Sequence, residues 1–170
     1  MKFKDLVKED FTFPDGSYHC KLDDFLFPSN GWVRFEVQDF DFVKLATQVD
    51  AVRRTAFHMD SDLKLELFIP YIPSARQDRL CDVGEPFTSK VVAGLINSLK
   101  FDKVITLRPH SDVMPALINN LKVMDISDTS VGWVFADLNV ILVAPDIGAS
   151  KATQKLGMHY RLPVVQAFKD

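Results

Sequence analysis

The sequence predicts an α/β fold with a largely parallel sheet. Strand-like and helix-like periodicities alternate along the chain, and three clusters of polar side chains follow directly on predicted strands. In parallel sheets of this kind, ligands bind beyond the carboxyl ends of the strands. We therefore expect the three clusters to meet at one edge of the sheet.

The first half of the chain has the order strand, strand, helix, strand. Residues 18–22 form a short candidate strand, and residues 32–37 (WVRFEV) alternate apolar and polar side chains as a half-buried strand does. From Asp41 onward the apolar side chains fall on one face of a helix, namely Leu45, Val49, Val52 and Ala56. Residues 63–71 (LKLELFIPY) return to a strand pattern.

The second half continues the alternation. Residues 84–100 predict a helix, because apolar residues recur at positions i, i+3, i+4 and i+7, and Pro86 suits its start. Residues 103–107 (KVITL) predict a strand, and residues 113–136 are less regular. The pattern then predicts a strand over 140–144, a helix over 150–160 and a last strand over 163–168.

Composition limits the function classes. The chain has 170 residues, 47% of them apolar, and a formal net charge of −3, which argues against a general nucleic-acid binder. No apolar stretch is long enough to span a membrane, and the first residues lack the apolar core of a signal peptide. The two cysteines, Cys20 and Cys81, favour a reducing compartment and hence the cytoplasm, although one disulfide between them is an alternative.

The first polar cluster is Arg-Gln-Asp-Arg at residues 76–79. Arg76 and Arg79 carry planar guanidinium groups that can bind phosphate oxygens through paired N–H donors. Gln77 adds an amide that can read a base edge or a hydroxyl group. The alternative is that Asp78 pairs with a neighbouring arginine on a solvated turn.

The other two clusters contain candidate metal ligands. His110 in the second cluster could ligate a divalent ion, although a lone histidine after a strand is more often structural. Asp146 in the third cluster could bind Mg²⁺, or it could cap the following helix. The chain has no Gly-rich phosphate loop and no nucleophile elbow. The residues alone thus predict a nucleotide- or phosphate-binding α/β domain that could also hold a metal.

Several segments resemble the ribose-phosphate pyrophosphokinase (phosphoribosyl pyrophosphate synthetase) family over nearly the whole chain. The most specific is IPYIPSARQDR at 69–79. FPDGS at 13–17 is similar to a Phe-x-Asp-Gly-Glu segment of the family, and the stretch from 85 to 107 resembles the helix and strand before its Asp-Leu-His motif. APDIGASKATQKLG resembles the family's Ser-Pro-Asp-x-Gly-Gly turn and the helix that follows it. VVQAFKD resembles a strand of the family that leads into a basic catalytic loop.

The resemblance implies a phosphoribosyltransferase-like fold, with residues 1–139 as an amino-terminal domain on the ATP side and 140–170 as the opening of a carboxyl-terminal domain. It implies transfer of the β,γ-diphosphoryl group of ATP to C1 of ribose 5-phosphate with Mg²⁺, and a homo-oligomer. The residues that it implies are Arg76 and Gln77 for ATP, Phe13 and Asp15 for the adenine of a neighbouring subunit, His110 and Asp146 for Mg²⁺–ATP, and Lys169 together with His110 for catalysis.

The chain also departs from the family pattern. Ser17 stands where the family has Glu, Arg108 stands where it has Asp, and Ala149 replaces a glycine. A positive charge at position 108 weakens metal binding unless the Arg108 side chain points away from the metal site or itself binds phosphate. The family's Asp-Asp…Thr-Gly-Gly-Thr loop for ribose phosphate has no counterpart, so we expect a fragment of a longer polypeptide that is inactive by itself. The alternative is a short homologue that binds nucleotide or regulates a partner without catalysis.

Overall fold

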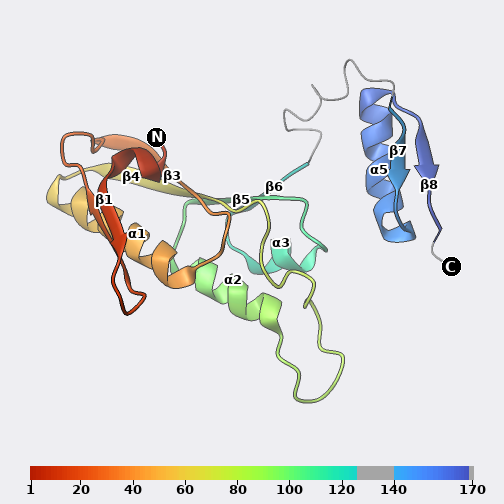
Figure 1. The fold of residues 1–170 in the computed structure, drawn as a ribbon, viewed down its shortest axis with the longest axis horizontal. Coiled ribbons are helices and arrows are strands. Elements are labelled where there is room, and N and C mark those ends of the chain that lie inside the picture. Colours follow the sequence, from red (N-terminus) through yellow and green to blue (C-terminus); the bar gives the residue numbers. More distant parts are fainter. Residues whose placement is uncertain (126–139, 169–170) are drawn as a thin grey trace. The chain divides into compact units, whose positions relative to one another are not determined.

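The computed structural model describes residues 1–125 and 140–168. The chain divides into two compact units, Met1–Val123 and Met124–Asp170 (Figure 1). No helix among the described residues has the length and apolar composition needed to cross a membrane.

The first unit is built on a four-stranded sheet in the order β3-β4-β5-β6. These strands are β3 (Asn30–Glu36), β4 (Asp62–Phe68), β5 (Lys103–Leu107) and β6 (Leu121–Met124). The β3–β4 and β4–β5 pairs are parallel. The prediction of an α/β fold with a mainly parallel sheet is therefore confirmed.

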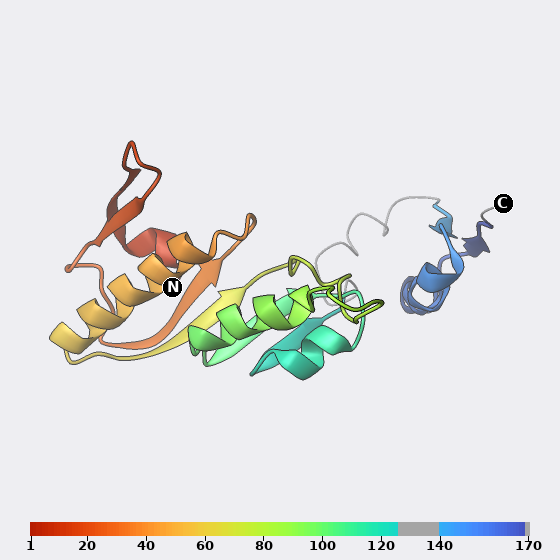
Figure 2. The same cartoon turned by 90° about the horizontal axis from the view of Figure 1, so that it is seen from below.

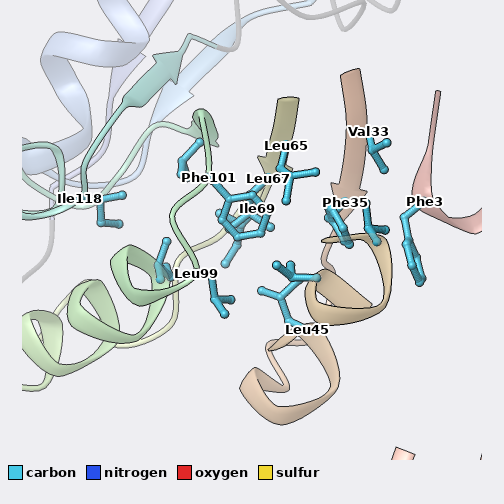
Figure 3. Close-up of a cluster of buried hydrophobic side chains, with 14 of the residues drawn as sticks. Phe3, Val33, Phe35, Leu45, Leu65, Leu67, Ile69, Leu99, Phe101 and Ile118 are labelled. Atoms are coloured by element: carbon cyan, nitrogen blue, oxygen red, sulfur yellow. The ribbon is translucent and has the colours of Figure 1, made fainter. Parts of the chain in front are cut away.

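Three helices lie on the same side of this sheet, below it in Figure 1 and in front of it in Figure 2. They are α1 (Phe42–His58), α2 (Thr88–Ser98) and α3 (Val113–Leu117). The apolar face predicted for the first helix is the one that α1 buries, because Leu45, Val49 and Val52 are almost inaccessible to solvent. Figure 3 shows Leu45 and Leu99 directed toward strand residues such as Phe35 and Leu67.

The opposite face of the sheet carries charged side chains in the first unit. Glu66 on the central strand β4 is buried, and its carboxylate pairs with Arg34 on β3 and with Lys103 on β5, the latter at 2.7 Å. Burial raises the pKa of Glu66, but hydrogen bonds from Lys103 and Arg34 outweigh that effect and lower it. Trp32 on β3 is 44% exposed on this face, with the ammonium group of Lys64 5.7 Å from its ring centre.

An antiparallel hairpin precedes the sheet. It follows the short 3₁₀ helix η1 (Phe3–Leu6) and consists of β1 (Val7–Thr12) and β2 (Tyr18–Leu22). The strand at 18–22 was predicted, whereas β1 was not, because VKEDFT shows no alternation and is largely exposed. The segment 113–136, interpreted as irregular, begins with α3 and β6, both too short for a periodicity to develop. Residues 126–139 lie outside the described part of the chain.

The second unit is a parallel strand–helix–strand motif. It contains β7 (Leu142–Ala144), α5 (Ile147–Tyr160) and β8 (Val164–Gln166), and β7 pairs with β8. Gly157 in α5 packs so closely on β8 that a methyl group at this position would clash with Val164. This contact explains why the last turn of α5 contains a glycine.

Candidate functional site

Two loops of the first unit leave the sheet side by side at the carboxyl ends of β4 and β5. Ile69, just after β4, donates its N–H to the carbonyl of Ile105 at 2.9 Å, and Leu107 donates to the carbonyl of Pro70 at 3.2 Å. The loop after β4, which leads to α2, is called here the arginine loop. The loop after β5, which leads to α3, is called the histidine loop.

A hydrogen bond joins the two loops. The Ser111 hydroxyl of the histidine loop donates to the Asp78 carboxylate of the arginine loop at 2.6 Å. This bond lowers the pKa of Asp78, and the positive charges of Arg79 and His110 lower it further. Asp78 is not paired closely with arginine, since the Arg79 Nε atom is 3.9 Å from the carboxylate and the Arg79 side chain is 83% exposed.

The backbone of the arginine loop is also held by helix α2. Ser89 in the first turn of α2 is fully buried, and its hydroxyl donates to the carbonyl of Ser74 at 2.8 Å. The Ser89 N–H donates to the carbonyl of Gln77, and the Gln77 N–H donates to the carbonyl of Ser74 at 2.9 Å. Ser74 has a φ of 58°, a left-handed conformation that is uncommon for residues other than glycine. The segment between Ser74 and Asp78 is therefore fixed by several bonds.

Two polar side chains of this segment have no hydrogen-bond partner among the described residues, namely Arg76 and Gln77. Arg76 and Gln77 are exposed, as are Arg108 and His110 in the histidine loop. Within the part of the chain that the structure describes, the Arg76 and Arg108 guanidinium groups form no ion pair. A polar segment with a rigid backbone and free donors is suited to binding an anionic ligand.

Phe13 and Asp15 lie at the tip of the β1–β2 hairpin. The Asp15 carboxylate accepts the N–H of Ser17 at 2.9 Å and its hydroxyl at 2.7 Å, and these bonds lower the pKa of Asp15. Phe13 is 46% exposed and packs edge-to-face on Phe11. Both views of the fold place this tip away from the arginine loop (Figures 1 and 2). The hairpin does not bring Phe13 and Asp15 to the two loops of its own chain.

Asp146 belongs to the second unit, where it is the N-cap residue of α5. Its carboxylate accepts the N–H of Ala149 at 2.9 Å. This cap is the alternative role that the sequence left open, and it starts the helix three residues before the predicted position. The convergence of Asp146 with the two loops of the first unit stays a prediction. Lys169 lies outside the described residues.

A preformed metal cluster is absent from the described ranges 1–125 and 140–168. No group of three or more histidine, cysteine, aspartate or glutamate side chains is arranged there to hold an ion. His110 and Asp146, the two predicted metal ligands, belong to different units.

A pocket of about 870 Å³ in the first unit lies away from these loops. It is lined by residues near the end of β3, the start of α1 and the hairpin, including Arg34, Asp41 and Tyr18. Its charges partly neutralise each other, for example through the ion pair of Lys2 with Glu36 at 2.9 Å. We assign no ligand to this pocket.

Two anchoring residues of the site were missed by sequence reasoning. Ser89 sits within a predicted helix, and nothing in the apolar pattern distinguishes it from a surface serine. Ser111 lies in the second polar cluster, but its partner Asp78 is far away in the sequence. Only the adjacency of the two loops could have suggested the bond.

Comparisons with known proteins agree on one family. The chain is 31% identical over 160 residues to a ribose-phosphate pyrophosphokinase of Rhodopirellula baltica, a match that covers 85% of this chain and 48% of that protein. It is 30% identical over 103 residues to a ribose-phosphate pyrophosphokinase 2 of Archaeoglobus fulgidus, covering 61% of this chain and 37% of that protein. No protein-family model matches the chain.

The fold agrees with the sequence comparison. The crystal structure of a phosphoribosylpyrophosphate synthetase from Mycobacterium smegmatis superposes with a TM-score of 0.71, at 19% identity, over 95% of this chain and 55% of that one. At this identity the likeness concerns the fold. The chain spans about half the length of the first curated relative that it matches.

Proposed function

This chain belongs to the ribose-phosphate pyrophosphokinase family, and on that premise we propose that it carries the ATP-binding part of a ribose-phosphate diphosphokinase. The reaction transfers the β,γ-diphosphoryl group of ATP to C1 of ribose 5-phosphate. The observation that supports this proposal best is the bond between Ser111 and Asp78, because it fastens the arginine loop to the histidine loop. The two bonded loops would present the Arg76 and Gln77 side chains to a nucleotide.

The proposed chemistry needs charge stabilisation more than covalent catalysis. The C1 hydroxyl oxygen forms a bond to the β-phosphorus and loses its proton to water, the bond from the β-phosphorus to the oxygen that bridges the α- and β-phosphates breaks, and AMP leaves with that oxygen. Negative charge spreads over the phosphate oxygens as this happens. The Arg76 guanidinium would stabilise that charge through fixed N–H donors, and the amide of Gln77 would orient the nucleotide. Lys169 would add positive charge, and His110 would hydrogen-bond the phosphates.

The adenine contacts would come from a second copy of the chain. Phe13 offers an exposed ring for stacking, and Asp15 offers a carboxylate oxygen that can accept from the adenine amino group. Because the hairpin tip lies away from the loops of its own chain, this role requires a homo-oligomer. Mixing Phe13→Ala chains with Arg76→Ala chains should restore ATP binding in part, because mixed assemblies then contain some intact sites.

The residues present do not make a good resident magnesium site. Mg²⁺ prefers several oxygen ligands, usually carboxylates and waters. In the two loops the Asp78 carboxylate is engaged by Ser111, and in the second unit the Asp146 carboxylate caps α5. Arg108 adds a cation beside His110. We therefore propose that Mg²⁺ enters the site as the complex with ATP and not as an ion held by protein ligands.

Release of AMP tests the proposed function. A polypeptide in which this chain continues into a ribose-phosphate-binding loop should release AMP from ATP only when ribose 5-phosphate is present. Phosphorus-31 NMR should show the diphosphoryl group on the sugar. A well-folded polypeptide that binds ATP but never forms AMP would exclude the catalytic function.

A second candidate is a homologue that binds nucleotide without catalysis and assembles with an active partner. The cation Arg108 beside His110 and the missing acid at Ser17 favour it. Analytical ultracentrifugation of this chain with an active ribose-phosphate pyrophosphokinase, with and without ATP, separates the candidates. A mixed assembly in which this chain contributes no turnover would support the second one.

A further inference from the structure

The two polar clusters of the site, residues 76–79 and 108–112, carry more positive than negative charge. Arg76 and Arg79 belong to the arginine loop and Arg108 begins the histidine loop, whereas the acids of the same clusters are Asp78 and Asp112. The Asp78 carboxylate is oriented toward Ser111 and its distance to Arg79 is too long for a hydrogen bond. Three guanidinium groups are thus left without a close anionic partner among the described residues.

The position of Arg108 indicates that it belongs to the site. It follows Leu107, whose N–H is bonded to the carbonyl of Pro70 at the start of the arginine loop. Its φ of 36° lies in the left-handed region, which is uncommon for residues other than glycine. Such conformations persist where surrounding contacts impose them, often at ligand sites. Three residues further on, Ser111 fixes the same loop to Asp78.

The chemistry of these groups favours direct contact with an anion over contact with a metal ion. Guanidinium groups bind phosphate oxygens through two parallel N–H donors, and they stay charged at all physiological pH values. A divalent cation beside the two clusters would be repelled by three positive charges, and within the clusters it would find one carboxylate without a hydrogen-bond partner among the described residues, that of Asp112. A polyphosphate can satisfy the three arginines without an intervening ion.

We propose that Arg108 is a phosphate-binding residue that acts with Arg76 and Arg79, so that the site binds the phosphate chain of ATP directly and does not require Mg²⁺. This inference deepens the proposed function and rests on it for the identity of the nucleotide. It assigns to Arg108 the neutralising role that a protein-bound metal would otherwise have.

Calorimetric titration of the full chain tests the inference. ATP is added in a buffer with Mg²⁺ and in a metal-free buffer with EDTA, and adenosine and inorganic tripolyphosphate serve as reference ligands. We expect the ATP dissociation constants in the two buffers to agree within about fivefold. Tripolyphosphate should compete with ATP in EDTA, whereas adenosine should bind far more weakly.

The diagnostic variant is Arg108→Asn, because asparagine tolerates the left-handed backbone that the position requires. Loss of one charge-assisted phosphate contact should weaken ATP binding in EDTA about tenfold or more, and less in Mg²⁺, which replaces part of the missing charge. Arg161→Asn is the matched control. Arg161 is also exposed and also has a left-handed φ, of 55°, but it ends α5 at the end opposite to Asp146.

The outcomes separate this inference from the proposed function. ATP binding that occurs in Mg²⁺ but disappears in EDTA would overturn the inference and leave the proposed function standing. Equal affinities of Arg108→Asn and Arg161→Asn would remove Arg108 from the site. If Arg108→Asn does not fold, Arg108→Lys can replace it. Lysine keeps the positive charge without the planar set of guanidinium donors, so it should weaken ATP binding less. The comparison of the two buffers on the unaltered chain tests the Mg²⁺ requirement without any variant. No ATP binding in either buffer would overturn both proposals.

Discussion

Two junctions between a strand and a helix show how differently the same topological position can be used. Between β4 and α2 the chain makes the long arginine loop, whose backbone is bonded to Ser89 and whose Asp78 is bonded to Ser111. Between β7 and α5 it makes a short turn in which Asp146 caps the helix. Both junctions follow the carboxyl end of a parallel strand, and both carry polar residues.

The difference lies in which groups the fold itself uses. In the arginine loop the hydrogen bonds are made by backbone groups, by Ser89 and Ser111, and by the carboxylates of Asp78, Asp82 and Glu85. The Arg76 side chain stays unpaired among the described residues. In the turn before α5 the carboxylate is engaged by the helix. Polar residues at a strand end are therefore better evidence for a ligand site when structural bonds leave their side chains available.

The largest expected effect is on ligand binding by the arginine loop. Arg76→Ala should weaken ATP binding by about tenfold to a hundredfold, because a charge-assisted phosphate contact is lost. The free energy of unfolding should change by less than about 0.5 kcal/mol, because the side chain is exposed and unpaired. Calorimetry and urea unfolding measure the two quantities.

Arg54→Ala provides the control for that prediction. Arg54 is an exposed arginine on α1 whose only short ion pair within the described residues is with Asp50 at 2.6 Å. It should leave ATP affinity unchanged. Equal effects of the two substitutions would mean that general charge, rather than the arginine loop, attracts the nucleotide.

A smaller effect should follow when the anchoring of the arginine loop is broken. Ser89→Ala removes the hydroxyl that donates to Ser74 and should lower the free energy of unfolding by about 0.5–1.5 kcal/mol. The loosened loop should also bind ATP less tightly. Ser98→Ala on the exposed side of the same helix is the comparison, and a larger loss of stability there would contradict the assigned anchor.

At the other junction the expected effect is on the helix. Asp146→Ala should destabilise α5 by about 1 kcal/mol, whereas Asp146→Asn should keep the cap, since asparagine caps helices as well as aspartate does. Hydrogen exchange of the Ala149 amide reports the cap. If Asp146→Asn preserves the cap and yet abolishes ATP use in the longer polypeptide, the carboxylate has a ligand role in addition.

The smallest effect concerns pH. The pKa of Asp78 is below its ordinary value of 3.8 in the folded chain, chiefly because of Ser111. A depressed carboxyl pKa stabilises the fold above the unfolded pKa, and the stabilisation is lost as pH falls through the folded value. Urea midpoints should therefore decrease below about pH 3.8, and Ser111→Ala should make that decrease shallower. An unchanged slope in Ser111→Ala would show that the bond does not set the pKa of Asp78.

Most of the regular elements could be predicted because their patterns are local. Residues 18–22 and 103–107 are strands with the predicted bounds, and α1 buries the predicted face. The predicted strand at 63–71 ends earlier, at Phe68, because the backbone leaves β4 before Pro70 to begin the arginine loop. Helix α5 begins at Ile147, three residues before the predicted start, because Asp146 caps it there.

The connections that make the site could not be predicted in the same way. The rule for parallel sheets places the ends of β4 and β5 at one edge, and the two loops indeed leave the sheet together. The bonds of Ser89 and Ser111, however, depend on the path of loops that no periodicity describes. Sequence alone therefore identified exposed candidates such as Arg76 better than the residues that position them.

The ion pairs of Glu66 with Arg34 and Lys103, on three adjacent strands, affect how this face of the sheet is exposed to solvent. Parallel sheets are usually covered on both faces, yet α1, α2 and α3 all lie on one side. Because the inner carboxylate is neutralised by a cation on each neighbouring strand, the opposite face can remain hydrated without burying an uncompensated charge. The same three charges make the middle of this face polar, so further apolar segments are less able to pack over it.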